Sequence, residues 1–131
     1  MDGRDLARAV ALARTGFGAS AILFPRAMAR LFFDAEEGRR PASRLLGRLF
    51  GIRDVALGAA ALRSLSRGED AREEIRLGMA CDLADIAVLL AGGARGLRPR
   101  TVLLGVAAAG AFAAASARAT RPGPASIPFD A

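Results

Sequence analysis

The feature that most constrains this chain is an uncharged stretch near its C-terminal end. Residues 101–117 read TVLLGVAAAGAFAAASA, so a helix built on them has apolar or small side chains on every face and no polar stripe to turn toward water. Such a helix needs to be buried on all sides or surrounded by lipid. A chain of 131 residues forms one domain that is too small to bury a helix all round, and we therefore expect a membrane protein.

Three further apolar stretches precede this one, at residues 6–24, 45–65 and 75–94. Each of the four is about 17–21 residues long, which is enough to cross a hydrocarbon core of about 30 Å at about 1.5 Å per residue. None of them alternates apolar and polar residues as a half-buried strand does. The sequence therefore predicts an all-α fold, a four-helix transmembrane bundle with antiparallel neighbours and short loops.

We expect a single membrane domain over residues 1–120, followed by a Pro-rich C-terminal tail over residues 121–131. The longest connection, residues 25–44, contains a short amphipathic piece at residues 26–33. Two interpretations of this piece are open: an ordinary helical extension, or a helix that lies in the membrane interface. In the second interpretation, the side chains that enter lipid are those of Met28, Leu31, Phe32 and Phe33.

The composition excludes several classes of protein. A single Cys rules out a disulfide framework, and the lack of His removes the commonest general base and metal ligand. All 19 basic residues are Arg, and the net charge is +6, but no basic patch is interleaved with aromatic residues, so we expect no nucleic-acid partner. The Arg residues gather at the ends of the apolar stretches, as in a multi-pass protein of the inner (cytoplasmic) membrane whose partner is the lipid bilayer. Arg14 interrupts the first stretch, which argues against a cleaved signal peptide.

Some charged residues lie inside the apolar stretches rather than at their ends. In antiparallel helices, Arg14, the pair Arg53–Asp54 and the pair Asp82–Asp85 fall at a similar depth near the centre of the bilayer. An isolated charge at that depth costs at least about 2.5–3.5 kcal/mol, so we expect these charges to be paired. With Arg48, which lies closer to a helix end, the Arg and Asp charges sum to zero. The sequence thus predicts a buried, charge-balanced network of Arg14, Arg48, Arg53, Asp54, Asp82 and Asp85.

The spacing of these residues along each helix supports the grouping. Asp82 and Asp85 are three residues apart and share a helix face with Gly78. Asp54 falls on a face of small residues, which suits close packing against another helix. The residues on that face are Gly47, Gly51, Asp54 and Gly58.

Two roles of the network are open. In one role it fixes the register and pairing of the helices. In the other it borders a cavity, in which an Asp side chain donates or carries a proton or anchors a ligand. The DxxD spacing of Asp82 and Asp85 also occurs in Mg²⁺ sites, but two carboxylates with Arg side chains nearby are too few oxygens, and we expect neither a metal nor another cofactor. The candidate catalytic residues are Asp54, Asp82 and Asp85, and the candidate ligand-binding residues are Arg14, Arg48 and Arg53.

Three functions are compatible with this pattern. The leading one is a small integral membrane protein whose network holds the bundle and which binds a lipophilic small molecule. The alternative is a membrane-embedded enzyme, an acid-catalysed cyclase or isomerase of a lipophilic substrate with an Asp as general acid. The third is a proton-coupled transporter. The sequence allows a homo-oligomer in each case.

Several segments together resemble a known family. They are ILFP at the end of the first stretch, RLFGIRDVALG at residues 48–58 and CDLADIAVLL at residues 81–90. The chain resembles, over about residues 5–118, a family of small uncharacterised four-helix membrane proteins of DoxX-like type that is common in actinobacteria. The most specific part is RxxGxRD, matched by Arg48, Gly51, Arg53 and Asp54, and the next is DxxD. The resemblance implies a four-helix membrane bundle with these charges at its centre, and it implies no established reaction.

Overall fold

The computed structural model describes residues 2–33 and 35–121, and over these residues it is built from helices without strands. The elements in chain order are α1 (Gly3–Leu23), α2 (Pro25–Phe32), the short 3₁₀ helix η1 (Glu37–Arg39), α3 (Pro41–Ser66), α4 (Arg72–Gly93) and α5 (Pro99–Ala119). The all-α prediction is confirmed, and the four long helices cover the four apolar stretches. Apart from Arg121, the predicted Pro-rich tail lies outside the described residues.

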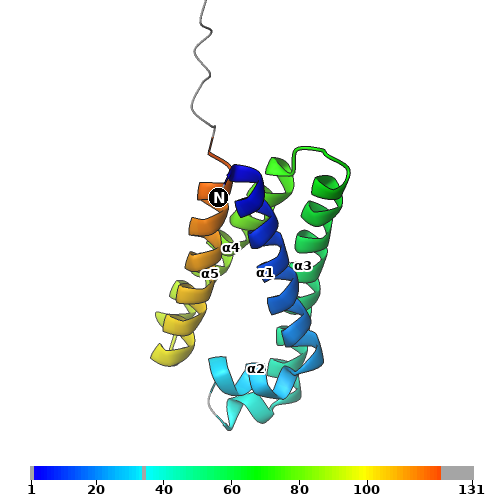
Figure 1. The fold of residues 1–131 in the computed structure, drawn as a ribbon. Helices are drawn as coiled ribbons and strands as arrows, with labels where there is room; N and C mark the ends of the chain where they lie inside the picture. Colours follow the sequence, from blue (N-terminus) through cyan, green and yellow to red (C-terminus); the bar gives the residue numbers. More distant parts are fainter. Residues whose placement is uncertain (1, 34, 122–131) are drawn as a thin grey trace, which may run out of the picture.

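Proline and glycine mark the ends of these helices. Pro25, Pro41 and Pro99 are the first residues of α2, α3 and α5, a position at which the missing backbone N–H is not needed. Gly68 and Gly96 take positive φ angles of 80° and 100° in the two short connections that reverse the chain after α3 and α4. Both connections join antiparallel neighbours, as the sequence predicts (Figure 1).

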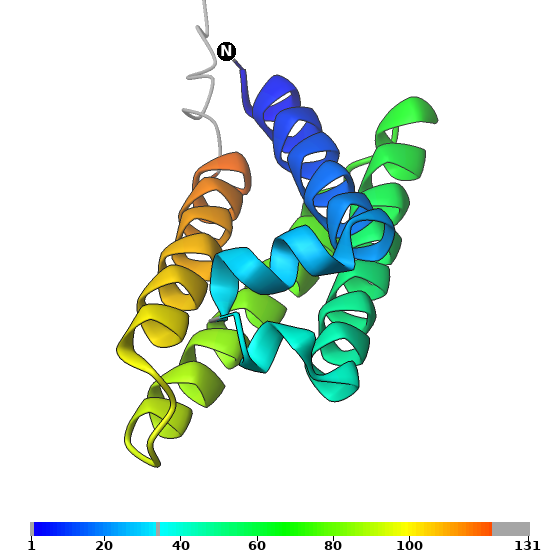
Figure 2. The same ribbon diagram turned by 90° about the horizontal axis from the view of Figure 1, so that it is seen from below.

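The four long helices run alternately up and down around the bundle (Figure 1). α1 packs mainly on α3 and α4 mainly on α5, so the bundle consists of two antiparallel pairs. Viewed from below, α2 crosses one end of the bundle from the α1 side toward α5 (Figure 2). The side chain of Thr101 at the start of α5 donates a hydrogen bond of 2.8 Å to the carbonyl oxygen of Phe32, which ties α5 to the last residue of α2.

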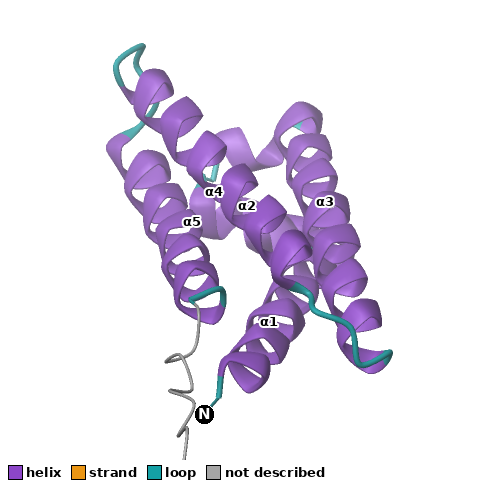
Figure 3. Ribbon diagram, turned by 90° about the horizontal axis from the view of Figure 1, so that it is seen from above, coloured by secondary structure: helices purple, strands orange, loops and turns teal. Residues whose placement is uncertain are grey.

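The prediction of four helices joined by short loops does not include the helix α2. It is a fifth α-helix that lies across one end of the long ones (Figure 2), and helices joined by loops make up the described chain (Figure 3). Its predicted apolar face turns inward at Met28 and Phe32, which line a cavity of the bundle together with the following residue Phe33, whereas Leu31 is exposed. The long connection after the first stretch is therefore a structured cover for one end of the bundle.

The seam between α1 and α3 is made by glycines. A Cβ atom on Gly18 would lie 2.5 Å from the carbonyl oxygen of Gly51, and a Cβ atom on Gly58 would lie 2.7 Å from the carbonyl oxygen of Ala11. Only hydrogen atoms fit at these positions, so the two backbones touch. The predicted small-residue seam is confirmed for Gly51 and Gly58, whereas Gly47 has no neighbour within 4 Å of a Cβ atom.

The distribution of apolar side chains is inverted relative to a water-soluble protein. Among the described residues, the buried apolar positions are alanines except for Val10 and Ile75. Large apolar side chains lie on the outside of all four long helices; Val88 is 70% exposed and Leu103 is 69% exposed. Others on this outer surface are Leu12, Leu23, Leu45, Leu46, Leu49, Ile52, Leu77, Leu83 and Leu90.

Two of the helices, α1 and α5, are long and apolar enough to cross a membrane by their length and composition. The helices α3 and α4 do not pass the same test, although both are as long as α1 or longer. The charges at Arg53, Asp54, Asp82 and Asp85 interrupt their apolar sequences.

The glycine seam yields a matched pair of substitutions on α1. We expect Gly18→Ala to destabilise the fold by about 1–3 kcal/mol, because the new methyl group collides with backbone atoms of α3. Gly16→Ala adds the same methyl group where nothing lies within 4 Å, and we expect it to be neutral or stabilising by up to about 1 kcal/mol. Thermal unfolding followed by far-ultraviolet circular dichroism gives the melting temperature of each variant, and the two values are compared. Equal melting temperatures for the two variants would contradict the close approach of α1 and α3.

Candidate functional site

The folded chain brings five of the six predicted charges into one network. Arg14 comes from α1, Arg53 and Asp54 from α3, and Asp82 and Asp85 from α4. The ion pairs run in the order Asp82, Arg14, Asp54, Arg53, Asp85. This network therefore links three helices across the interior of the bundle.

Arg14 is the bridge between the two helix pairs. Its Nη1 atom donates to Oδ1 of Asp54 and to Oδ1 of Asp82, both at 3.1 Å, and its Nη2 atom donates to Oδ2 of Asp82. Arg14, Asp54 and Asp82 are only 3%, 5% and 3% exposed. Charges this deeply buried are stable only when they are paired and hydrogen-bonded.

Arg53 closes the other half of the network. Its Nη1 and Nη2 atoms donate to Oδ1 and Oδ2 of Asp85 at 2.9 Å and 2.6 Å, the two-point geometry that a guanidinium offers a carboxylate. Nη2 also donates to Oδ1 of Asp54 at 3.3 Å. Arg53 and Asp85 are half-buried, so this end of the network lies nearer to the surface than Arg14.

The buried guanidinium of Arg14 packs against a glycine of α4 and an aromatic ring of α5. A Cβ atom on Gly78 would lie 3.2 Å from Cζ and Nε of Arg14, so a larger residue there would press on the guanidinium. The ring of Phe112 on α5 lies 4.9 Å from Cζ of Arg14, within the range of a cation–π contact. The predicted common face of Gly78 and Asp82 is thus the face that receives Arg14.

Arg48 is not a member of the network, and the prediction of a charge-balanced network is wrong. Arg48 is exposed and lines a separate groove with the basic residues Arg26, Arg30 and Arg44 near the start of α3. Asp54 is six positions after Arg48, which corresponds to a rotation of about 240° around the helix, so the two side chains leave α3 on different faces. The remaining two Arg and three Asp residues have a formal sum of −1.

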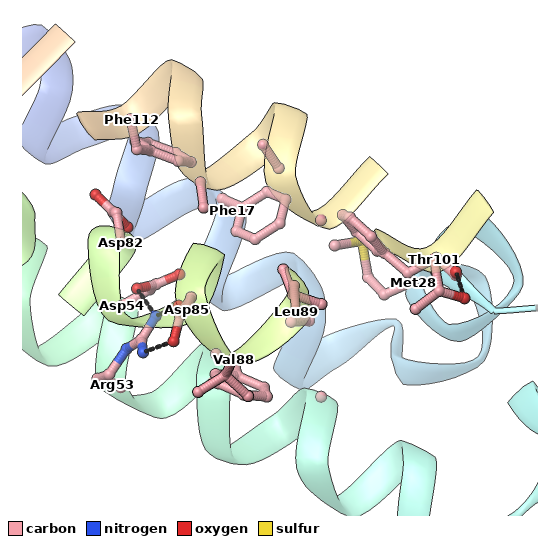
Figure 4. Close-up of a pocket in the computed structure, with 18 of the residues that line it drawn as sticks. Phe17, Met28, Arg53, Asp54, Asp82, Asp85, Val88, Leu89, Thr101 and Phe112 are labelled. Carbon is pink, nitrogen blue, oxygen red and sulfur yellow. Dashed lines mark hydrogen bonds and ion pairs between the residues drawn. The ribbon is translucent and has the colours of Figure 1, made fainter. Parts of the chain in front are cut away.

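The network forms one end of a cavity with a volume of about 360 Å³. Figure 4 shows the side chains of Asp54, Asp82 and Asp85 together at this end, and those of Met28 and Thr101 at the other. The remaining walls are apolar and come from all five α-helices. They include Phe17, Ala21, Phe32, Phe33, Phe50, Val88, Leu89, Ala108, Ala109 and Phe112.

Two residues of the cavity lining, one on α3 and one on α4, are exposed at the outer surface. They are Phe50 on α3 and Val88 on α4, which are 49% and 70% exposed. These two helices contact one another less than α1 contacts α3 or α4 contacts α5.

One carboxylate of the network retains an unused oxygen. Both oxygens of Asp82 and both oxygens of Asp85 accept hydrogen bonds from guanidinium groups. Asp54 accepts two hydrogen bonds at Oδ1, and within the described part of the chain its Oδ2 atom accepts none. The free oxygen belongs to a residue that lines the cavity.

The apolar lining of the cavity is the part of the site that the sequence pattern did not reveal. The amphipathic pattern of residues 26–33 is compatible with a helical extension or an interfacial helix and does not indicate that Met28, Phe32 and Phe33 line a cavity, and Phe17 and Phe112 belong to no local motif. Five of the seven Phe residues of the chain line this one cavity. Their concentration depends on contacts between distant segments, and no spacing within one helix indicates it.

Within residues 2–33 and 35–121, no group of three or more His, Cys, Asp or Glu side chains could hold a metal ion. The DxxD carboxylates of Asp82 and Asp85 face guanidinium groups at the distances given above.

Comparison with protein-family models, with curated proteins and with solved structures finds no match to this chain.

The network predicts a large difference between two Arg substitutions. Arg14→Leu leaves Asp54 and Asp82 buried without their main partner, and we expect it to destabilise the fold by about 3–5 kcal/mol. Adding Asp82→Leu to Arg14→Leu removes the carboxylate that has lost its ion-pair partner, and should restore part of the lost stability. Arg48→Gln, outside the network, should change stability by less than about 0.5 kcal/mol. The free energy of unfolding of the three variants is measured by titration with a denaturing detergent. A double variant that is no more stable than Arg14→Leu would contradict the ion pair between Arg14 and Asp82.

Proposed function

We propose that this chain is a four-helix integral membrane protein that binds a small lipophilic molecule in the cavity beside the Arg/Asp network. The observation that carries the proposal is the cavity itself: about 360 Å³, apolar on most sides and bordered by three carboxylates at one end. A volume of a few hundred Å³ with a few convergent polar groups in an apolar wall is typical of small-molecule sites.

The inverted distribution of side chains supports a place in the membrane. In lipid there is no hydrophobic force to drive large side chains inward, and helices associate through small residues and polar contacts. The bundle has these properties: its buried apolar positions are mostly alanines, glycines lie where helices touch, and many Leu side chains lie on the outside. Outside the network, the charged side chains of the described residues all lie in connections or within about two turns of a helix end, where they can reach the headgroups.

We propose that α3 and α4 cross the membrane together with α1 and α5. Their central charges are the ones that the network neutralises, so those charges face the interior of the bundle and not lipid. Their outer faces carry large apolar side chains, among them Ile52 on α3 and Leu83 on α4. This yields a multi-pass protein, which we place in the inner membrane.

A labelling experiment separates four spans from two. With four spans, the connection after α3 and the connection after α4 lie on opposite sides of the membrane; if only α1 and α5 cross, both lie on the same side. We expect single-cysteine variants Glu69→Cys and Arg95→Cys, made in a Cys81→Ser background, to react with a membrane-impermeant maleimide from opposite sides of sealed vesicles. Reaction from the same side would refute the four-span topology.

The enzyme and the transporter remain alternatives within this proposal. Both oxygens of Asp82 and both oxygens of Asp85 accept from guanidinium groups, so protonation of either carboxylate would weaken its ion pair with Arg14 or Arg53. Asp54 is the carboxyl with an oxygen available, so acid catalysis or proton transport would depend on it. A place in the DoxX-like family likewise remains a prediction that rests on the sequence motifs.

Filling the cavity should abolish binding of a lipophilic probe. We expect Ala109→Phe, on the wall of the cavity, to reduce binding of tritiated 1-adamantanol to the protein in nanodiscs by at least about tenfold. Ala107→Phe is the matched control, because Ala107 is exposed on the same helix and does not line the cavity. Nanodiscs without protein give the partition of the probe into lipid. Equal binding by the two variants would show that the probe does not occupy this cavity.

A further inference from the structure

The charges that border the cavity do not balance. Two guanidinium groups face three carboxylates, which gives the network a formal charge of −1 in surroundings made mostly of apolar side chains. Arg53 is the one basic residue of the cavity lining within the described chain, and it is already part of that count. An unbalanced charge away from water is costly unless something compensates it. The cavity is where a compensating charge can be held.

The oxygen that lacks a partner identifies where that charge would lie. Oδ2 of Asp54 accepts no hydrogen bond from the described residues, yet Asp54 is only 5% exposed. Oδ2 is not among the fully buried side-chain atoms that lack a partner, so it is accessible from the cavity that Asp54 lines. The Nε atom of Arg53 also lacks a partner, but it is fully buried and out of reach of a ligand. The accessible unsatisfied group is thus an acceptor with negative charge.

The aromatic lining is an independent observation that favours a cation. The faces of aromatic rings attract positive charge, most strongly where water is excluded. Two rings of the lining already receive the guanidinium groups of the network: Phe112 lies 4.9 Å from Arg14, and Phe50 lies 5.2 Å from Arg53. The ring of Phe17 packs edge-on against Phe32, with centroids 6.1 Å apart, and lies in the wall of the same cavity.

From these observations we propose that the cavity takes an organic cation with an apolar body, such as a hydrophobic amine, and that its charged group lies beside Oδ2 of Asp54 with its body against the phenylalanines. The inference rests on the proposed function and adds the charge of the ligand to it. A cation at this position makes the formal charge of the site zero and gives the free oxygen a donor.

Three probes that share one apolar body test the charge of the ligand. They are 1-adamantylammonium, which is cationic at neutral pH, the neutral 1-adamantanol and the anionic 1-adamantanecarboxylate. Their binding is measured on the full chain in nanodiscs of phosphatidylcholine, whose zwitterionic headgroups carry no net charge, after subtraction of binding to empty nanodiscs. We expect the ammonium to bind at least about tenfold more tightly than the alcohol, and the carboxylate to bind more weakly than both.

Two variants locate the charge recognition. Asp54→Asn keeps an oxygen that can accept from Arg14 and Arg53 but removes the negative charge, so the affinity for the ammonium should fall to that for the alcohol while the alcohol still binds. Glu73→Gln makes the same chemical change at an exposed residue of α4 and should leave all three affinities unchanged. If Asp54→Asn does not fold, Phe17→Leu decides the point: it should weaken binding of the ammonium about threefold more than binding of the alcohol, because both probes lose the same apolar contact but only the ammonium loses its attraction to the ring.

The outcomes separate the two proposals. Equal affinity for ammonium and alcohol overturns the inference about charge and leaves the lipophilic cavity in place. Tighter binding of the carboxylate also overturns it and would make Arg53 the anchor. Failure of all three probes to bind overturns the proposed function and the inference together.

Discussion

The bridge that Arg14 makes between Asp54 and Asp82 is the interaction on which the rest of this structure depends. It joins α1 to α3 and α4 at positions where the interior contains few large apolar side chains. A core of alanines and glycines buries little area per residue, so its packing alone gives weak association of helices. In such a bundle, a charged hydrogen bond withdrawn from water contributes a larger share of the specificity than it would in a core of leucines.

The close packing and the charges act at different places and together create the cavity. Within each pair of helices, glycines let the chains approach: Gly18 meets Gly51 between α1 and α3, and Gly105 receives the side chain of Leu89 between α5 and α4. Between the pairs, a buried cluster made mostly of alanines packs near one end of the bundle, and the network joins the helices beside the cavity. Beside the network the two pairs are joined by long charged side chains, and the cavity lies next to these, with Met28 of α2 at its other end (Figure 4).

The sequence predicts the parts of this arrangement that repeat along one helix. The lengths of the apolar stretches indicate the four long helices, and the antiparallel order places Arg14, Asp54 and Asp82 at one depth, as the structure has them. Depth along a helix, however, does not determine the direction in which a side chain points. The prediction that Arg48 joins the network is wrong for this reason: its position around α3 turns it away from Asp54. The role of α2 could not be derived either, since a helix that covers a cavity and a helix that lies in an interface have the same amphipathic pattern. The phenylalanines of the cavity come from separate helices and meet only through the tertiary fold.

The imbalance of the network makes the structural and the functional role of the charges compatible. If the network served only to hold the helices, a third Arg at the position of the cavity would cancel its charge and reduce the cost of burial. The chain has many Arg residues, and yet none beyond Arg53 lines the cavity in the part of the structure described. The two roles fall on the two oxygens of Asp54. Oδ1 accepts from both Arg14 and Arg53 and so holds the network together, while Oδ2 accepts no hydrogen bond from the described residues. The same side chain can therefore support the fold with one oxygen and present its charge to a ligand with the other.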